Sequence, residues 1–147
     1  MNIVELVRQI TNEYLTSANL TDEIHIDYTV DDGNTENVGI FSVGDVKVGE
    51  DVVGNETRRN SISLFLVRQG SEDSERLENM SFLINMADKF DNIEEDSYDV
   101  DIGNEDNLKH GKLKSIACSN AMLYGRTTDT GDPVYQMNML ATYKLYV

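Results

Sequence analysis

One acidic stretch of this chain contains residues that could bind a metal ion. Asp99, Asp101 and Gly103 have the spacing with which a calcium loop of the EF-hand type begins. Such a loop needs a third oxygen ligand at its fifth position, and Gly103 occupies that place here. The pattern favours an ordinary acidic loop. A looser metal site, or an enzyme built around Asp99, Asp101, Glu105 and Asp106, is the alternative.

A second stretch, Asp129-Thr130-Gly131, has the triplet of aspartic proteases, in which two carboxylates share one proton. In an aspartic protease that aspartate follows an apolar strand and lies in a site from which water is largely excluded. Here Gly125-Arg126-Thr127-Thr128 precedes the triplet and Pro133 follows it, as in an exposed turn. We interpret the triplet as turn sequence.

The other residues with catalytic or metal-binding side chains are scattered along the chain. His25 and His110 have no partner at the spacing of a zinc site, and Cys118 falls within the alternation of a strand. No glycine-rich phosphate loop opens a helix. We therefore expect no catalytic site, no cofactor and no bound metal.

The charge balance is strongly acidic. The chain has 27 Asp and Glu against 12 Lys and Arg, a formal net charge of -15. Binding to free nucleic acid needs clustered basic residues, and the only adjacent pair is Arg58-Arg59, so sequence-specific nucleic-acid binding is not expected. Eight acids and no basic residue fall between Asp91 and Asp106, which indicates either a solvated loop or a negative surface.

Length and composition predict one domain spanning residues 1–147. The single cysteine excludes an internal disulfide and fits a reducing compartment. Because no apolar run is long enough to cross a bilayer, we expect a soluble, intracellular protein without a membrane partner.

The first half of the chain predicts one helix and extended segments. Residues 3–14 place apolar side chains at helical spacing, and Asn2 with Glu5 offers a capping pair. Residues 24–28 alternate as in a half-buried strand. Residues 38–53 are rich in valine but interrupted by glycines, which favours extended or hairpin chain over a firm strand.

The middle of the chain predicts a strand followed by a helix. Residues 61–67 have apolar side chains on both faces, so this strand should be covered on both faces or central in its sheet. Ser71 is the expected N-cap of the helix. The expected core stripe of that helix is Leu77, Met80, Leu83, Ile84, Ala87 and Phe90.

The last third predicts a long hairpin of residues 113–124 and 134–147 around the turn 129–133. Tyr135 and Tyr143 share one face of the second strand with several apolar residues. Fully extended, that strand would span roughly 45 Å, longer than the diameter of about 40 Å expected for the domain. It should therefore bend or reach a neighbouring molecule.

In this order of elements the chain resembles the minor capsid or tail terminator proteins of long-tailed bacteriophages. The resemblance covers the whole chain. It includes the run Val53-Gly54-Asn55-Glu56-Thr57-Arg58-Arg59 before the strand Ser61–Val67, the acidic helix, and the final strand with Tyr135-Gln136-Met137-Asn138-Met139-Leu140-Ala141-Thr142-Tyr143.

The resemblance implies an α+β domain, with an N-terminal helix and one central helix packed on a mostly antiparallel sheet that ends in a long C-terminal β-hairpin. It also implies a homohexameric ring that caps the tail tube, ends tail polymerisation and helps to join tail to head.

The implied partners are further copies of the chain, the tail tube protein and a head–tail connector or neck protein, with DNA passing through the ring. The implied location is the tail or neck of the virion, and the host cytoplasm during assembly. A neck or head-completion role is the alternative within the same virion region.

The candidate contact residues are Arg58, Arg59, Asp99, Asp101, Tyr135 and Tyr143. For Arg58-Arg59 the simplest expectation is a local ion pair with nearby acids, and the alternative is that one arginine crosses a subunit boundary. The hairpin of residues 113–147 and the acidic segment 91–106 are the expected contact surfaces.

Overall fold

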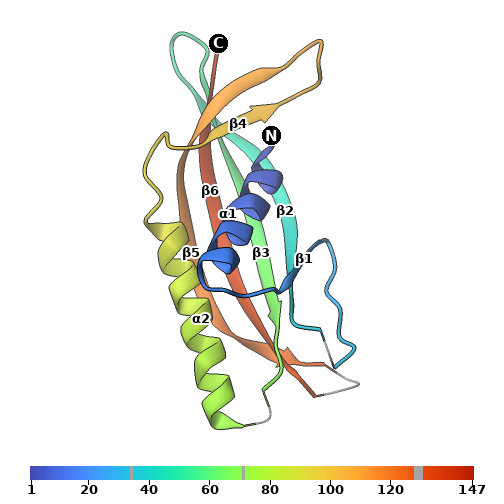
Figure 1. Ribbon diagram of the computed structural model, residues 1–147. Coiled ribbons are helices and arrows are strands. Elements are labelled where there is room, and N and C mark those ends of the chain that lie inside the picture. Colours follow the sequence, from blue (N-terminus) through green and yellow to red (C-terminus); the bar gives the residue numbers. More distant parts are fainter. Residues whose placement is uncertain (34, 71, 128–130) are drawn as a thin grey trace.

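The computed structural model describes residues 1–33, 35–70, 72–127 and 131–147 (Figure 1). Within these ranges the chain forms two helices and six strands. They are α1 (Ile3–Ser17), β1 (Glu23–Ile26), β2 (Asn37–Glu50), β3 (Glu56–Val67), α2 (Asp73–Asp91), β4 (Asp99–Ile102), β5 (Lys109–Arg126) and β6 (Pro133–Tyr146). The expected N-cap Ser71, and Asp129 and Thr130 of the protease-like triplet, lie outside the described residues.

The strands form a single mixed sheet in the order β1-β2-β3-β6-β5-β4. β1 pairs with β2 in parallel, and the other neighbours are antiparallel. The predicted α+β class with a mostly antiparallel sheet is therefore confirmed. β3 and β6 lie at the centre, and their register is unbroken from Glu56–Leu145 to Val67–Val134.

The N-terminal helix begins where the sequence predicts. The backbone N–H of Glu5 donates to Asn2 Oδ1 at 2.9 Å, and the backbone N–H of Asn2 donates to Glu5 Oε2 at 3.1 Å. This reciprocal pair satisfies two N–H groups that the first turn of a helix leaves unpaired. The buried face of α1 consists of Ile3, Leu6, Val7, Ile10, Thr11 and Leu15.

The core stripe predicted for the second helix is confirmed in part: Leu83 and Phe90 are buried, and Met80 and Ala87 pack against the core. The buried residues of α2 are Asn79, Leu83, Met86 and Phe90. Leu77 is 70% exposed and Ile84 is 55% exposed, so their assignment to the core was wrong. Asn79 takes a core position because its amide is satisfied there, accepting from Arg68 Nε at 3.1 Å and donating to the Gln69 carbonyl at 3.3 Å.

The valine-rich segment is extended and forms one arm of a hairpin with β3, as expected, but it is one continuous strand, β2, where a firm strand was not expected. Two of its glycines, Gly44 and Gly49, lie at irregularities of that strand. Its register with β3 shifts between Ser42 and Gly44 and again between Lys47 and Gly49. Such bulges bend a strand and increase its twist without ending it.

The helices α1 and α2 lie on one face of the sheet (Figure 1). The core cluster joins their apolar residues to inward-facing strand residues that include Ile40, Leu64, Leu113, Met137 and Tyr143. The predicted central position of residues 61–67 is confirmed. The second face of that strand is not covered by any helix or strand among the described residues.

The terminal hairpin is confirmed by the antiparallel pairing of β5 with β6. Of the two expected alternatives for the last strand, bending or reaching a neighbouring molecule, β6 bends with the curved sheet (Figure 1). In the described part of the chain, neither helix is long and apolar enough to cross a membrane.

Candidate functional site

Of the four acids proposed as metal ligands, Asp99 and Asp101 are held by cations, while Glu105 and Asp106 are exposed and form no ion pair with another described residue. Asp99 Oδ1 lies 2.5 Å from Lys112 Nζ. Asp101 accepts from the N-terminal ammonium at 2.9 Å, and its other oxygen lies 2.7 Å from His110 Nδ1. Hydrogen bonds from the N-terminus and then from His110 hold the pKa of Asp101 below its ordinary value. Within the described ranges, no group of three His, Cys, Asp or Glu side chains could hold a metal ion.

The cysteine and the first histidine are not arranged as a nucleophile and base. Burial raises the pKa of the Cys118 thiol to about 12, and the neighbouring Asp91 adds to this shift. The thiol is therefore protonated at neutral pH. The ring of His25 stacks on Tyr28, with centroids 4.4 Å apart, in the segment that follows β1.

A clamp around Arg68, which sequence reasoning missed, ties the end of β3 to the start of the sheet. Arg68 Nη1 donates to both oxygens of Asp22 at 3.0 Å, and Nη2 lies 2.7 Å from Glu36. The Asp22 side chain is 3% exposed, and burial raises its pKa. The guanidinium also lies 4.9 Å from the ring centroid of Phe82 on α2. The two carboxylates already neutralise the arginine. We therefore interpret the clamp as a structural link between secondary-structure elements.

A second network sits on the helix side of the sheet, at the end beyond α1. Asp45 accepts from Arg58 Nε at 2.8 Å, Asn60 Nδ2 at 3.0 Å and Tyr143 Oη at 2.5 Å. Burial favours a higher pKa for Asp45, but the hydrogen bonds from Tyr143, Asn60 and Arg58 outweigh it and hold the pKa below its ordinary value. The network therefore joins β2, β3 and β6, and Arg58 forms the local ion pair.

The middle of the sheet face opposite the helices carries a single charged residue. The next row of the same face carries Lys112 and Lys144, which pair with Asp99 and Asp51. Strand pairing places on it the residues that alternate with the core positions of β2, β3, β6 and β5. We define the open face as Phe41, Val46, Arg59, Ser61, Ser63, Phe65, Ser115, Ala117, Ser119, Met122, Tyr124, Gln136, Asn138, Leu140 and Thr142. In a chain with 27 acids, this set contains none.

Aromatic and aliphatic side chains run across the open face. Phe65 makes edge contacts with Phe41 and Tyr124, with ring centroids 5.3 Å and 5.1 Å away. Met122 is 52% exposed and Leu140 is 38% exposed. Exposed apolar groups gathered on one sheet face are typical of a surface that contacts another molecule.

Arg59 is the one charged residue of the open face. It lies opposite Val46 on β2 and Thr142 on β6, on the other side of the sheet from Arg58. Among the described residues no carboxylate forms an ion pair with it. An arginine without an ion-pair partner beside apolar groups can pair with an acid of another molecule.

The outer edge of β2 adds a second feature to this surface. β1 pairs only with Asn37–Ile40, so along the edge that faces away from β3 the rest of β2 has no neighbouring strand in the described part of the chain. Val46 on this edge is 58% exposed. An unpaired strand edge presents N–H and C=O groups that another chain can bind, although the bulges in β2 limit that pairing.

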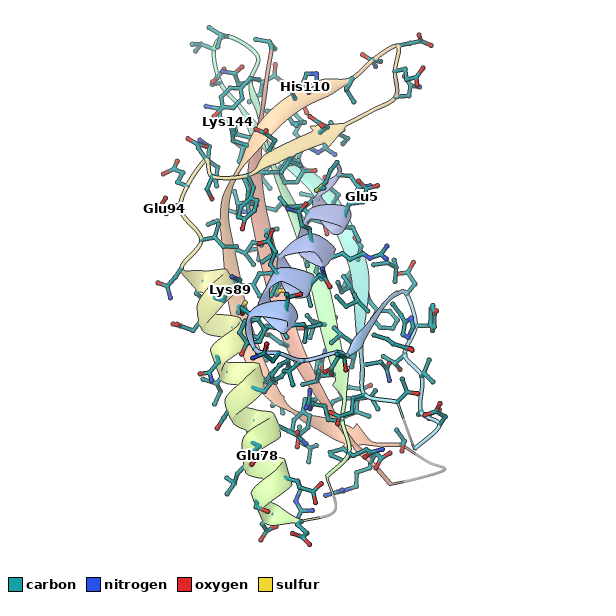
Figure 2. All side chains as sticks on the ribbon, in the orientation of Figure 1. Glu5, Glu78, Lys89, Glu94, His110 and Lys144 are labelled. Carbon is teal, nitrogen blue, oxygen red and sulfur yellow. The ribbon has the colours of Figure 1, made fainter. Side chains whose placement is uncertain are left out.

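The helix side carries much of the acid. Figure 2 shows Glu78 on α2 and Glu94 on the segment that follows it. The exposed side of α2 has the acids Asp73, Glu78 and Asp88, and between them the exposed apolar residues Leu77 and Ile84. The exposed residues of α1 are polar, and the exposed apolar residue Met1 lies just before the helix.

The proposed contact residues thus have different positions. Arg59 stands alone on the open face, while Arg58, Asp99 and Asp101 are engaged within the molecule. Tyr135 and Tyr143 are each 2% exposed, so their side chains belong to the core and do not reach a partner. The acidic segment 91–106 is held to β5 by Asp96–Lys114 and Asp99–Lys112, so it is not a freely solvated loop.

A comparison with protein-family models finds no match for this chain, and a comparison with curated proteins finds none either.

Proposed function

We propose that this protein is a structural component of a long-tailed bacteriophage or prophage, which forms a ring on the end of the tail tube. The ring would end polymerisation of the tube and present a different surface to the connector of the filled head. The proposed position in the virion rests on the resemblance of the chain, in its order of elements and its motifs, to tail terminator proteins. The proposed assembly role rests on the open face.

The open face supports the proposal because a sheet normally buries both faces or exposes polar residues on one of them. Here the open face mixes small polar residues with the exposed apolar side chains of Met122, Tyr124 and Leu140, and Arg59 is its only charge. The opposite side is acidic. A cap that stops growth needs two unlike surfaces, one that fits the assembly and one that does not admit another tube subunit.

Adding the purified protein to separated tails and filled heads tests the proposal. We expect it to bind at one end of the tail, visible by electron microscopy, and to restore joining of tails to heads. Binding to heads alone would favour the neck or head-completion role.

The metal-binding alternative predicts a different result. If Asp99 and Asp101 form a calcium site, calcium should raise the melting temperature in a saturable way at micromolar concentration, and Asp99→Asn with Asp101→Asn should remove the effect. The assembly role predicts no such stabilisation, because Lys112 and the N-terminus already neutralise these acids.

A further inference from the structure

We propose that copies of this chain associate head to tail, with the open face of one copy covering the exposed side of α2 of the next. This inference rests on the proposed ring and names the surfaces that build it. The two surfaces belong to different parts of one molecule, so the contact repeats from copy to copy.

The open face has the shape that a helix covers. Its four strands lie about 4.8 Å apart and its rows of side chains about 6.8 Å apart, which gives a patch of roughly 19 Å by 27 Å, or about 500 Å². α2 has 19 residues and is therefore about 28 Å long. A helix of this length spans the patch from end to end and, with a diameter of about 10 Å, covers about half of its width.

The helix and the patch supply part of the area that a stable contact needs. A stable interface buries roughly 800 Å² on each partner. One helix about 10 Å wide covers about 280 Å² of the patch, roughly a third of that area. The adjoining β2 edge, on which Val46 is 58% exposed, can supply part of the remainder.

The exposed side of α2 is the complementary helix surface within the described residues. Leu77 and Ile84 are seven residues apart and so lie on one side of the helix, exposed by 70% and 55%. The exposed side of α1 offers polar residues such as Gln9 and Asn12 instead. Between the two helices, only α2 therefore presents apolar groups for a second sheet face to bury.

The charges also match. Arg59 is the single charge of the open face and has no ion-pair partner among the described residues. The exposed side of α2 carries Glu78 and Asp88, together with Asp73, which pairs with Arg76 of the same helix. Open face against open face would place two arginines in one contact without an acid, and α2 against α2 would oppose the acids. The head-to-tail arrangement avoids both repulsions.

Two variants that block opposite surfaces test this arrangement. Leu140→Glu puts an acid on the open face, and Ile84→Glu puts one on the exposed side of α2. Both side chains are partly exposed, so each variant should fold and melt like wild type. Val52→Glu is the matched control, because Val52 is fully exposed in the β2–β3 turn, away from both surfaces. Ala117→Glu, also on the open face, replaces Leu140→Glu if that variant fails to fold.

Analytical ultracentrifugation should find wild type and Val52→Glu as closed oligomers, and each blocking variant alone as monomer. An equal mixture of the two blocking variants should form a 1:1 pair and nothing larger, since each has one intact surface. Assembly of Ile84→Glu alone, an unpaired mixture, or a wild type that stays monomeric at high concentration would overturn the inference. If both variants form normal rings, this contact is wrong and the ring proposal stands. If phage lacking the protein make attached tails of normal length, the proposed function fails whatever the contact.

Discussion

Arg58 and Arg59 are adjacent in the sequence, yet Arg58 binds Asp45 on the helix side of the sheet and Arg59 stands on the open face. The alternation of a strand separates them. The two expectations for this pair, a local ion pair and a contact with another molecule, therefore concern different residues. Arg58 forms the local pair, and the intermolecular contact of Arg59 stays a prediction.

Replacing Arg59 by glutamate should weaken assembly at least tenfold, because the new acid would face the acids of α2. The free energy of unfolding of the monomer should change by no more than about 0.5 kcal/mol, as for other surface substitutions, so its melting temperature should change little. Sedimentation velocity and thermal unfolding measure the two effects. Arg8→Glu, at an exposed arginine of α1, is the matched control. Equal assembly of the two variants would contradict the role given to Arg59.

Replacing Arg58 by methionine should destabilise the folded chain. Asp45 would lose one of its hydrogen-bond donors, and removing one partner of a partly buried polar group costs about 1–3 kcal/mol. Urea unfolding gives the free energy. Arg59→Met should cost less than about 0.5 kcal/mol, since its side chain is exposed. Similar losses in both variants would show that the network around Asp45 is not the source of the effect.

Acid should reveal the Asp45 network through its pH dependence. The lowered pKa of Asp45 means that its ionised form is favoured in the folded chain. Its contribution to stability is thus present above its ordinary pKa of 3.8 and is lost as the pH falls through the lower folded value. The stability difference between wild type and Asp45→Asn should be constant from neutral pH to about pH 5 and shrink below about pH 4.

Tyr143→Phe removes the shortest of those hydrogen bonds and should show the same pH dependence in weaker form. Thermal unfolding between pH 7 and pH 3 measures both variants. A difference between wild type and Asp45→Asn that stays constant down to pH 3 would contradict the assignment.

Replacing Arg68 by methionine should be the most damaging of these changes. It would leave the Asp22 carboxylate, 3% exposed, without its cation, and breaking a buried ion pair on one side costs about 3–5 kcal/mol. Adding Asp22→Asn to the same chain should recover part of the loss, because the buried charge is then removed as well. Chemical unfolding compares the single and double variants. No recovery in the double variant would place the damage elsewhere, for example in the contact of Arg68 with Phe82.

The sequence predicted the elements whose signals are local. The Asn2–Glu5 cap, the strand at residues 61–67 and the terminal hairpin all follow from the spacing of a few residues. The continuity of β2 could not be read in this way, because its pairing with β3 outweighs the weak strand preference of its glycines.

The buried stripe of α2 and the clamp around Arg68 depend on distant partners. Asn79 enters the core only because Arg68 and Gln69 satisfy its amide. Asp22 and Arg68 are 46 positions apart, and no local pattern joins them. The sequence indicated part of the open face, because Phe65 alternates with the core residues of β3. That pattern did not decide whether the second face of the strand is covered.

The proposed role in ending tail polymerisation is tested by the length of the tails made without this protein. In the phage or prophage that encodes the chain, the gene would be deleted and tail lengths measured by electron microscopy, with the wild-type gene supplied separately as the control. We expect filled heads and unattached tails whose tubes vary in length and often exceed the normal value, and we expect the supplied gene to restore both uniform length and joining. Tails of normal length attached to heads in the absence of the protein would contradict the proposed role.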